Sequence, residues 1–233
     1  MNKQSNSYSI IYIIVLAIVV GAALAFTSAA LSDKQQENAD KDKMRQILSA
    51  IHITAPSDSI IALYSEYITG SFVVDETGKK IEGDAFDVNV ANESKKKDED
   101  RELPVFVGKS SDGSTKYILP VYGAGLWGPI WGYVAFNSDG KTIFGAYFAH
   151  QGETPGLGAE IEKPAFSDRF IGKSIFKQGK FLPITVVKAG TQPSRGEDYV
   201  DGVSGGTITS NGVASMLANC LTPYEAFLQS LSD

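Results

Sequence analysis

An unbroken apolar segment near the start of the chain limits the fold more than any other feature. Residues 10–26 read IIYIIVLAIVVGAALAF, and no charged residue occurs between Lys3 and Asp33. Counted from Tyr8 to Leu31, the segment is long enough to cross about 30 Å of hydrocarbon as a helix. The sequence therefore predicts one transmembrane helix within residues 1–32.

A cleaved signal peptide is the alternative, because Ser28, Ala29 and Ala30 are small enough for a peptidase site. Signal peptides have apolar regions of only about 7 to 15 residues, so the length favours a retained anchor. Basic residues lie on both sides of the segment, so the charge bias does not fix its orientation. The short tail is most simply left in the cytoplasm, and we expect the domain on the periplasmic side of the cell inner membrane.

The chain after the anchor predicts a stalk helix that leads into the domain. Its apolar residues recur at helical spacing: Met44, Ile47, Leu48 and Ile51. Pro56 ends this helix, and Ser57 or Asp58 can cap a second helix that runs to Tyr67. The mixed-charge run at residues 92–102 is typical of a solvated loop, with a docking patch as the alternative.

Residues 103–149 predict a β-meander, in which Asp139 and Gly140 form a hairpin turn between alternating apolar runs. The expected fold is α+β, with a mostly antiparallel sheet and flanking helices. Domains are expected at residues 33–100, an accessory helical stalk and α/β region, and at 101–233. The remaining elements are expected as a strand from Gly70, a helix-like stretch at 165–175, a strand at 182–189 and helices at 211–221 and 223–231.

Composition excludes several classes of function. The net charge of −6 argues against nucleic acid as a partner. A single cysteine, Cys220, cannot form an internal disulfide or a cysteine-rich metal cluster, and it is typical of a small buried helix residue. His52 and His150 are far apart in sequence, so we expect no metal site.

Three glycine-rich segments stand out, and none fits the phosphate-binding loop of the P-loop NTPases or the Rossmann fingerprint. They are residues 123–128 (GAGLWG), 150–159 (HQGETPGLGA) and 201–213 (DGVSGGTITSNGV). In the third, four hydroxyl side chains precede an apolar helix: Ser204, Thr207, Thr209 and Ser210. Because free N–H groups at a helix start bind phosphate, this loop predicts a phosphate cradle, with a linker rich in capping residues as an equal alternative.

The first two segments each place a glycine turn beside large apolar residues, Leu126 and Trp127 in one and Leu157 in the other. Such turns could form the two walls of a slot for a flat ring. Hairpin turns with core anchors are the commoner explanation for either segment alone.

The third segment resembles the D-x-x-[ST]-G-A-T flavinylation motif of the FMN-binding domain family. The resemblance implies that a flavin transferase joins FMN to Thr207 through a phosphoester, using FAD and Mg²⁺. Asp201, Ser204, Gly205 and Gly206 fill the other positions of the motif. Gly206 departs from the family, which usually has Ala there, and this departure could weaken recognition by the transferase.

The other two segments resemble the family's G-L-W-G and E-T-P-G-L-G elements. The implied contacts to the flavin are Leu126, Trp127, Glu153, Thr154, Gly156 and Leu157. Lys188 could offset the phosphate charge, although an ordinary solvated lysine is the commoner explanation. No residue is expected to act as a general base or nucleophile during turnover.

The chain from the anchor through Val213 is similar to the membrane electron-carrier subunits of this family. The resemblance implies a subunit of the six-subunit Na⁺-translocating NADH:quinone reductase, which relays electrons from an iron centre to a second flavin. Its partners would be the other subunits, the membrane and, during maturation, the flavin transferase. The alternatives are the G subunit of the Rnf complex and a membrane-anchored module that holds FMN non-covalently.

Overall fold

A computed structural model of the chain describes residues 6–232, and the chain divides into two compact units between Lys43 and Met44. Helix α1 runs from Asn6 to Ala50, so it begins in the first unit and ends in the second. The predicted anchor and stalk are therefore one continuous helix. Lys3, the basic residue before the apolar segment, lies outside the described residues.

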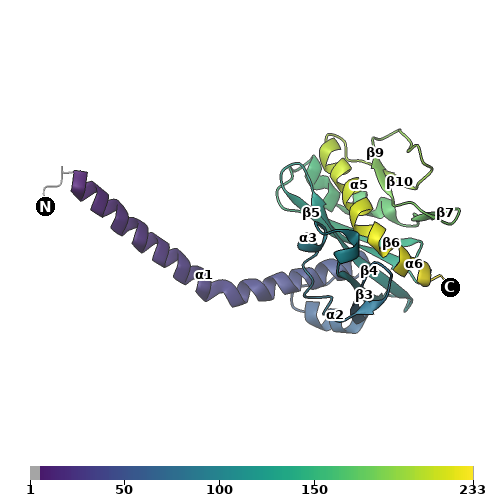
Figure 1. Cartoon of the computed structure of the whole chain (residues 1–233), viewed down its shortest axis with the longest axis horizontal. Coiled ribbons are helices and arrows are strands. Elements are labelled where there is room, and N and C mark those ends of the chain that lie inside the picture. The colour runs from purple at the N-terminus through teal and green to yellow at the C-terminus, as the bar shows by residue number, and fades with distance from the viewer. Residues whose placement is uncertain (1–5, 233) are drawn as a thin grey trace. The chain divides into compact units, whose positions relative to one another are not determined.

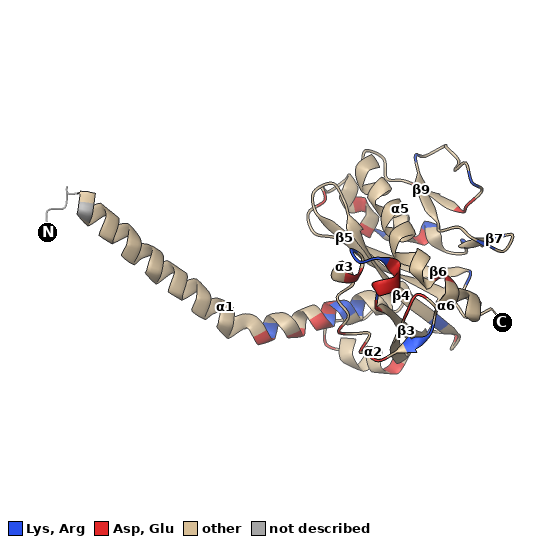
Figure 2. Ribbon diagram, viewed as in Figure 1, with Lys and Arg blue, Asp and Glu red and all other residues tan. Residues whose placement is uncertain are grey.

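The first part of α1 carries no charged side chain before Asp33, as Figure 2 shows. Its apolar side chains from Ile10 to Phe26 are all exposed. By length and composition, this is the one described helix that could cross a membrane. A helix that is apolar on all sides and unburied matches the expectation of a lipid environment.

The second unit is built on a six-stranded sheet with the order β2-β1-β3-β4-β5-β6. Every pairing in it is antiparallel. The strands are β1 (Ile68–Val74), β2 (Lys80–Ile81), β3 (Leu103–Lys109), β4 (Thr115–Ala124), β5 (Pro129–Asn137) and β6 (Ile143–His150). The predicted meander is confirmed, and Gly140 N–H donates to Asn137 O in the predicted β5–β6 turn. The boundary expected near residue 100 falls between β1 and β3, which pair directly.

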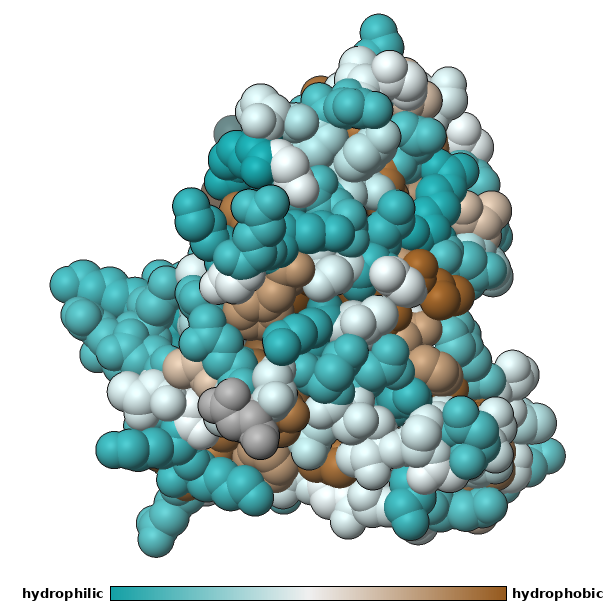
Figure 3. All heavy atoms as spheres, turned by 90° about the vertical axis from the view of Figure 1, so that its right-hand side faces the viewer, coloured by the Kyte–Doolittle hydropathy of each residue, from teal (hydrophilic) through white to brown (hydrophobic). Residues whose placement is uncertain are grey.

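Both faces of this sheet are covered, and the alternation of side chains along a strand divides them into two cores. On β5, Val134 and Phe136 face the core beneath helix α5 (Thr207–Leu221), whereas Tyr133 and Ala135 face the other core. That second core contains the last turns of α1 and helix α2 (Ile60–Tyr67). The surface seen in Figure 3 is mainly hydrophilic, with apolar side chains exposed in separate spots.

Short elements fill the connections around α5, which crosses the sheet in Figure 1. They are η2 (Gly158–Glu162), α4 (Pro164–Ser167), η3 (Asp168–Phe170), β7 (Phe176–Lys177), β8 (Lys180–Phe181), β9 (Thr185–Val187), β10 (Tyr199–Asp201), η4 (Thr222–Tyr224) and α6 (Glu225–Ser230). Strands β9 and β10 form a separate parallel pair. These elements complete the predicted α+β fold.

The mixed-charge run begins within α3 (Val90–Glu93) and contains η1 (Asp98–Asp100), and most of its side chains are exposed. Glu93 and Arg101 are the exceptions, because both are buried. The Arg101 guanidinium donates to the carbonyl oxygen and the side-chain oxygen of Asn219, near the C-terminal end of α5. A cation at a helix C-terminus is stabilised by the helix dipole, so this loop stabilises the C-terminal end of α5.

Candidate functional site

The three glycine-rich segments come together around one cavity of about 390 Å³, which we call the apolar cavity. The first segment contributes Leu126 and Trp127, and the second contributes Thr154 and Leu157. The third contributes residues 205–209, and Glu153 and Gly158 complete the lining. Segments separated by up to eighty residues in sequence therefore share one site, and its volume lies within the range of small-molecule pockets.

Helix α5 begins at Thr207, and the expected start at Asn211 is wrong by one turn. The N-cap residue is Gly206, which has no side chain to cap the helix, while Ser210 N–H donates to its carbonyl at 2.8 Å. The N–H groups of Thr207, Ile208 and Thr209 thus stand at an uncapped helix start, where intrahelical acceptors are lacking. The third segment forms the N-terminus of the helix rather than only a loop before it.

Two of the four hydroxyl groups in the third segment are engaged inside the protein. Thr209 Oγ1 donates to Glu153 Oε2, and Ser210 Oγ accepts the N–H of Val203 at 2.9 Å. Both side chains are buried. Ser204 and Thr207 are exposed, and no residue within 6–232 forms a hydrogen bond with either side chain. The structure therefore leaves two hydroxyls available to a ligand or a modifying enzyme.

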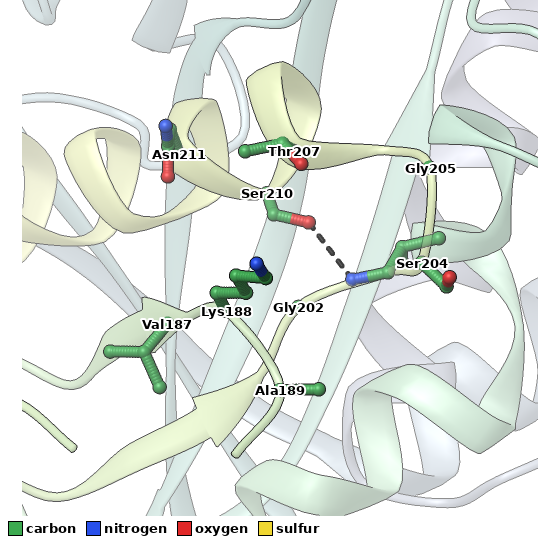
Figure 4. A pocket seen from close by; sticks show the side chains of 10 residues that line it. Val187, Lys188, Ala189, Gly202, Ser204, Gly205, Thr207, Ser210 and Asn211 are labelled. Atoms are coloured by element: carbon green, nitrogen blue, oxygen red, sulfur yellow. Dashed lines mark hydrogen bonds between the residues drawn. The ribbon is translucent and has the colours of Figure 1, made fainter. Parts of the chain in front are cut away.

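Thr207 also borders a second space of about 160 Å³, which we call the small cavity. Figure 4 shows the Lys188 side chain extending from the end of β9 toward the start of α5, where Ser210 and Asn211 lie. Ser204 lines the small cavity but not the apolar one, whereas Thr207 lines both. Thr207 is thus the available hydroxyl at the junction of a cationic and an apolar compartment.

The rim of the apolar cavity carries an unusual set of exposed hydrophobic side chains. Trp127 is 69% exposed and Ile208 is 58% exposed, and Leu126 and Leu157 are each nearly half exposed. Clustered apolar side chains on a surface usually mark a ligand or partner site, because exposing them to water costs free energy. Ile208 was not singled out in the sequence, although it directly follows Thr207.

Glu153 lies beneath this rim and is only 4% exposed. Its Oε1 accepts the N–H of Trp127 at 2.8 Å, and its Oε2 accepts the hydroxyl of Thr209. Burial raises the pKa of the Glu153 carboxyl, but the hydrogen bonds from Thr209, Trp127 and Leu126 outweigh burial and hold the pKa below its usual value. The carboxylate joins all three glycine-rich segments.

Two glycines make room for the Glu153 carboxylate. A Cβ atom on Gly125 would lie 2.5 Å from Glu153 Oε1. A Cβ atom on Gly158 would overlap both Glu153 Oε2 and Thr209 Oγ1. The glycines of the first two segments are therefore explained in part by the buried acid and not only by turn formation.

Asp201 and Gly156 lie on the other side of the third segment, in a groove of about 670 Å³ that we call the outer groove. Neither lines the apolar cavity or the small cavity. The carbonyl oxygen of Asp201 accepts a hydrogen bond from Arg169 Nη1 at 2.8 Å, which fixes the end of β10. Sequence patterns offered no indication of Arg169.

The cradle at α5, the free threonine and the flanking apolar slot define an FMN-binding domain, and a model of the FMN-binding domain family matches residues 125–222. The chain is 35% identical over 228 residues to the C subunit of Na⁺-translocating NADH-quinone reductase from Vibrio anguillarum, covering 91% of this chain and 89% of the relative. The C subunit from Vibrio alginolyticus is likewise 35% identical, over 230 residues. The chain belongs to the family formed by the C subunits of Na⁺-translocating NADH-quinone reductases.

Two solved structures agree with this assignment. The C subunit of the reductase from Parabacteroides distasonis is 50% identical and superposes with a TM-score of 0.79, covering 85% of this chain and 96% of that one. NqrC of Shewanella oneidensis is 26% identical, with a TM-score of 0.67 over 83% of this chain and 98% of that one. The domain fold of this chain is therefore that of the reductase C subunits.

Proposed function

We propose that this chain is an electron-transfer subunit of a Na⁺-translocating NADH:quinone reductase and carries one FMN joined by a phosphoester to Thr207. The observation that carries the proposal is the state of the Thr207 hydroxyl. It is exposed, forms no hydrogen bond with any residue in the described range, and borders both cavities. The relatives' name as reductase subunits and the match to the FMN-binding domain support the reaction class.

The residues around Thr207 suit a phosphate group. The uncapped N–H groups of α5 and the positive end of its dipole favour an anion next to the threonine. Lys188 adds a positive charge across the small cavity, and Ser204 and Asn211 add polar atoms. Together these groups would hold and neutralise a phosphate esterified to the threonine oxygen.

The apolar cavity suits a flat aromatic ring on the other side of Thr207. Leu126, Trp127 and Leu157 would provide its walls, and Thr154 would provide a polar contact. When bound, FMN supplies the one- and two-electron chemistry of its ring, while the protein supplies position and electrostatics. The exposed rim would leave one edge of the ring accessible to electron donors and acceptors.

Three residues of the motif would act without contacting the flavin directly: Gly205, Gly206 and Asp201. Gly205 and Gly206 would shape the backbone that presents Thr207, since both line the apolar cavity. Asp201 faces the outer groove, so we propose that it supports the third segment from outside or meets the flavin transferase, which acts during maturation. Gly156 would act in the same indirect way.

The proposed partners are the other reductase subunits, and the proposed location is the inner membrane with the domain on the periplasmic side. The apolar first part of α1 supports a single membrane span. Electrons would pass from a carrier in the membrane subunits, through this flavin, to a second flavin. Within residues 6–232, no group of three or more His, Cys, Asp or Glu side chains could hold a metal ion.

The test compares Thr207→Ala with Ser194→Ala, which removes an exposed, unbonded hydroxyl outside the motif and outside the three cavities. Each full-length protein is produced with a flavin transferase, denatured, and examined by intact mass and in-gel flavin fluorescence. We expect wild type and Ser194→Ala to carry one FMN and Thr207→Ala to carry none. A flavin released by denaturation of wild type would indicate a non-covalent module instead, and co-purifying subunits would distinguish an Rnf-type complex.

A further inference from the structure

A buried negative charge lies under the apolar cavity without a lysine or arginine partner, and His150 is the basic side chain whose charge acts on it. Glu153 is one of the residues that line the cavity, and its side chain is almost completely buried. None of the lysines or arginines in the described part of the chain forms an ion pair with it. Its hydrogen bonds come from two backbone N–H groups and one threonine hydroxyl, which stabilise an anion but leave its net charge in place.

The geometry points to Glu153 as a positioning residue that holds the apolar cavity together and that, through its buried negative charge, lowers the reduction potential of a flavin bound there. The inference rests on the proposed function, because it places the flavin ring in this cavity. The sequence alone predicted a direct contact between Glu153 and the flavin, and it gave no indication of this positioning and electrostatic role.

The positioning role follows from what the carboxylate joins. One oxygen holds the Leu126–Trp127 turn through backbone N–H groups, and the other holds the first turn of α5 through Thr209. The side chain of Trp127 is mostly exposed and that of Leu126 is nearly half exposed, so few packing contacts fix this turn. The distance between the apolar wall and Thr207 therefore depends on Glu153.

The electrostatic role follows from charge conservation. When a neutral oxidised ring accepts one electron from a reduced carrier, it gains one negative charge unless a proton follows. A nearby anion in a site of low dielectric constant repels that added charge more strongly than it would in water. The Glu153 carboxylate therefore destabilises the reduced ring, and removing its negative charge should stabilise the reduced ring.

The experiment uses the full-length protein, produced with a flavin transferase and purified in detergent, and measures the midpoint potential of the attached flavin by redox titration with mediators. Glu153→Gln preserves the size of the side chain, and its amide can donate to the Thr209 hydroxyl while its oxygen accepts from Trp127. We expect a higher midpoint potential than in wild type. Glu160→Gln is the matched control, because it removes an acid that directly follows the second segment and lines the outer groove instead of the apolar cavity.

Thr209→Val and Thr209→Ser separate position from charge. The valine variant keeps the acid but removes its hydroxyl donor, so the Leu126–Trp127 turn should loosen. In a Trp131→Phe background, Trp127 fluorescence should then become more accessible to a quencher without a rise in potential at neutral pH. The serine variant keeps the donor and should behave as wild type.

Thr209→Val also tests the charge if Glu153→Gln does not fold. Loss of the hydroxyl donor should raise the pKa of Glu153, so the potential of Thr209→Val should exceed that of wild type over the pH interval between the two Glu153 pKa values. His150 and Glu162 face the same segment and form an ion pair at 3.4 Å when the histidine is protonated, but they are present in both proteins and cancel in the comparison.

The outcomes separate the two proposals. A Glu153→Gln protein that carries FMN but has an unchanged or lower potential overturns the inference, as does a Thr209→Val pH curve that coincides with wild type. A rise of equal size in Glu160→Gln also overturns it, because a general change in surface charge would then explain the effect. A wild-type chain without the mass increment of FMN overturns the proposed function instead.

Discussion

Alanine at Gly205 should destabilise the protein much more than alanine at Gly206, although the two positions are adjacent. Gly205 has φ = 74°, in the left-handed region, and a Cβ atom there would lie 2.6 Å from Leu157 Cδ2. Gly206 has φ = −106°, and its Cβ atom would lie 3.2 Å from Val203 and 3.3 Å from Gly158. The first position requires glycine for two reasons, whereas the second accepts alanine with small adjustments.

The magnitudes follow from these distances. A non-glycine residue in the left-handed region costs about 1–2 kcal/mol, and displacing Leu157 costs about 1 kcal/mol more. Reduced freedom of the unfolded chain returns about 0.4–1 kcal/mol. We expect Gly205→Ala to lower the free energy of unfolding by about 2 kcal/mol and the melting temperature by about 4–8 °C. Gly206→Ala should stay within about 1 kcal/mol of wild type.

The assay is thermal unfolding of both full-length variants in detergent, followed by intact mass to measure the flavinylated fraction. Because alanine is the usual residue of the flavinylation motif at position 206, Gly206→Ala should be flavinylated at least as completely as wild type. Equal destabilisation by the two substitutions would refute the backbone geometry described for this segment. A flavinylation defect confined to Gly206→Ala would refute the argument that the site accepts alanine.

Three further outcomes test the framework around the site. Arg101→Ala should lower the free energy of unfolding by about 3 kcal/mol in chemical denaturation, because it removes a buried guanidinium that donates to Asn219 and to the carbonyl oxygens of Ser94 and Lys96, and Arg101→Lys should restore only part of this. Trp131→Phe should cost about 1 kcal/mol by the same assay, since it removes the 3.0 Å hydrogen bond from Trp131 Nε1 to Gln46. Burial raises the pKa of Asp198, but its hydrogen bonds from a backbone N–H and a lysine outweigh burial and hold the pKa below 3.8. Its stabilisation is therefore present above about pH 4 and is lost as the pH falls through the folded-state pKa, so Asp198→Asn should reduce the acid sensitivity of unfolding below pH 4.

Local patterns were sufficient for most of the fold. The alternation in residues 103–149 and the Asp139–Gly140 turn predicted a meander that the structure confirms. The apolar run and the helical spacing after it predicted helices, which form one continuous α1. These features depend on neighbours in sequence, so single-sequence reasoning can reach them.

The start of α5 could not be predicted in this way. Residues 205–210 combine two glycines with β-branched and small polar residues, which are weak helix formers. The helical conformation from Thr207 onward is supported by contacts from distant segments, above all the hydrogen bond between Thr209 and Glu153, 56 residues apart. Local sequence patterns likewise do not reveal that this contact holds the Glu153 carboxylate against the first turn of α5.

The continuity of α1 has a consequence for any attempt to separate the domain from its anchor. Ile47, Leu48 and Ala50 are fully buried, and all three belong to the core against the sheet. A truncated chain that begins after residue 50 would therefore lose part of the domain's interior together with the anchor. A soluble version should begin between Asp33 and Met44, where α1 is already charged and has not yet entered the core.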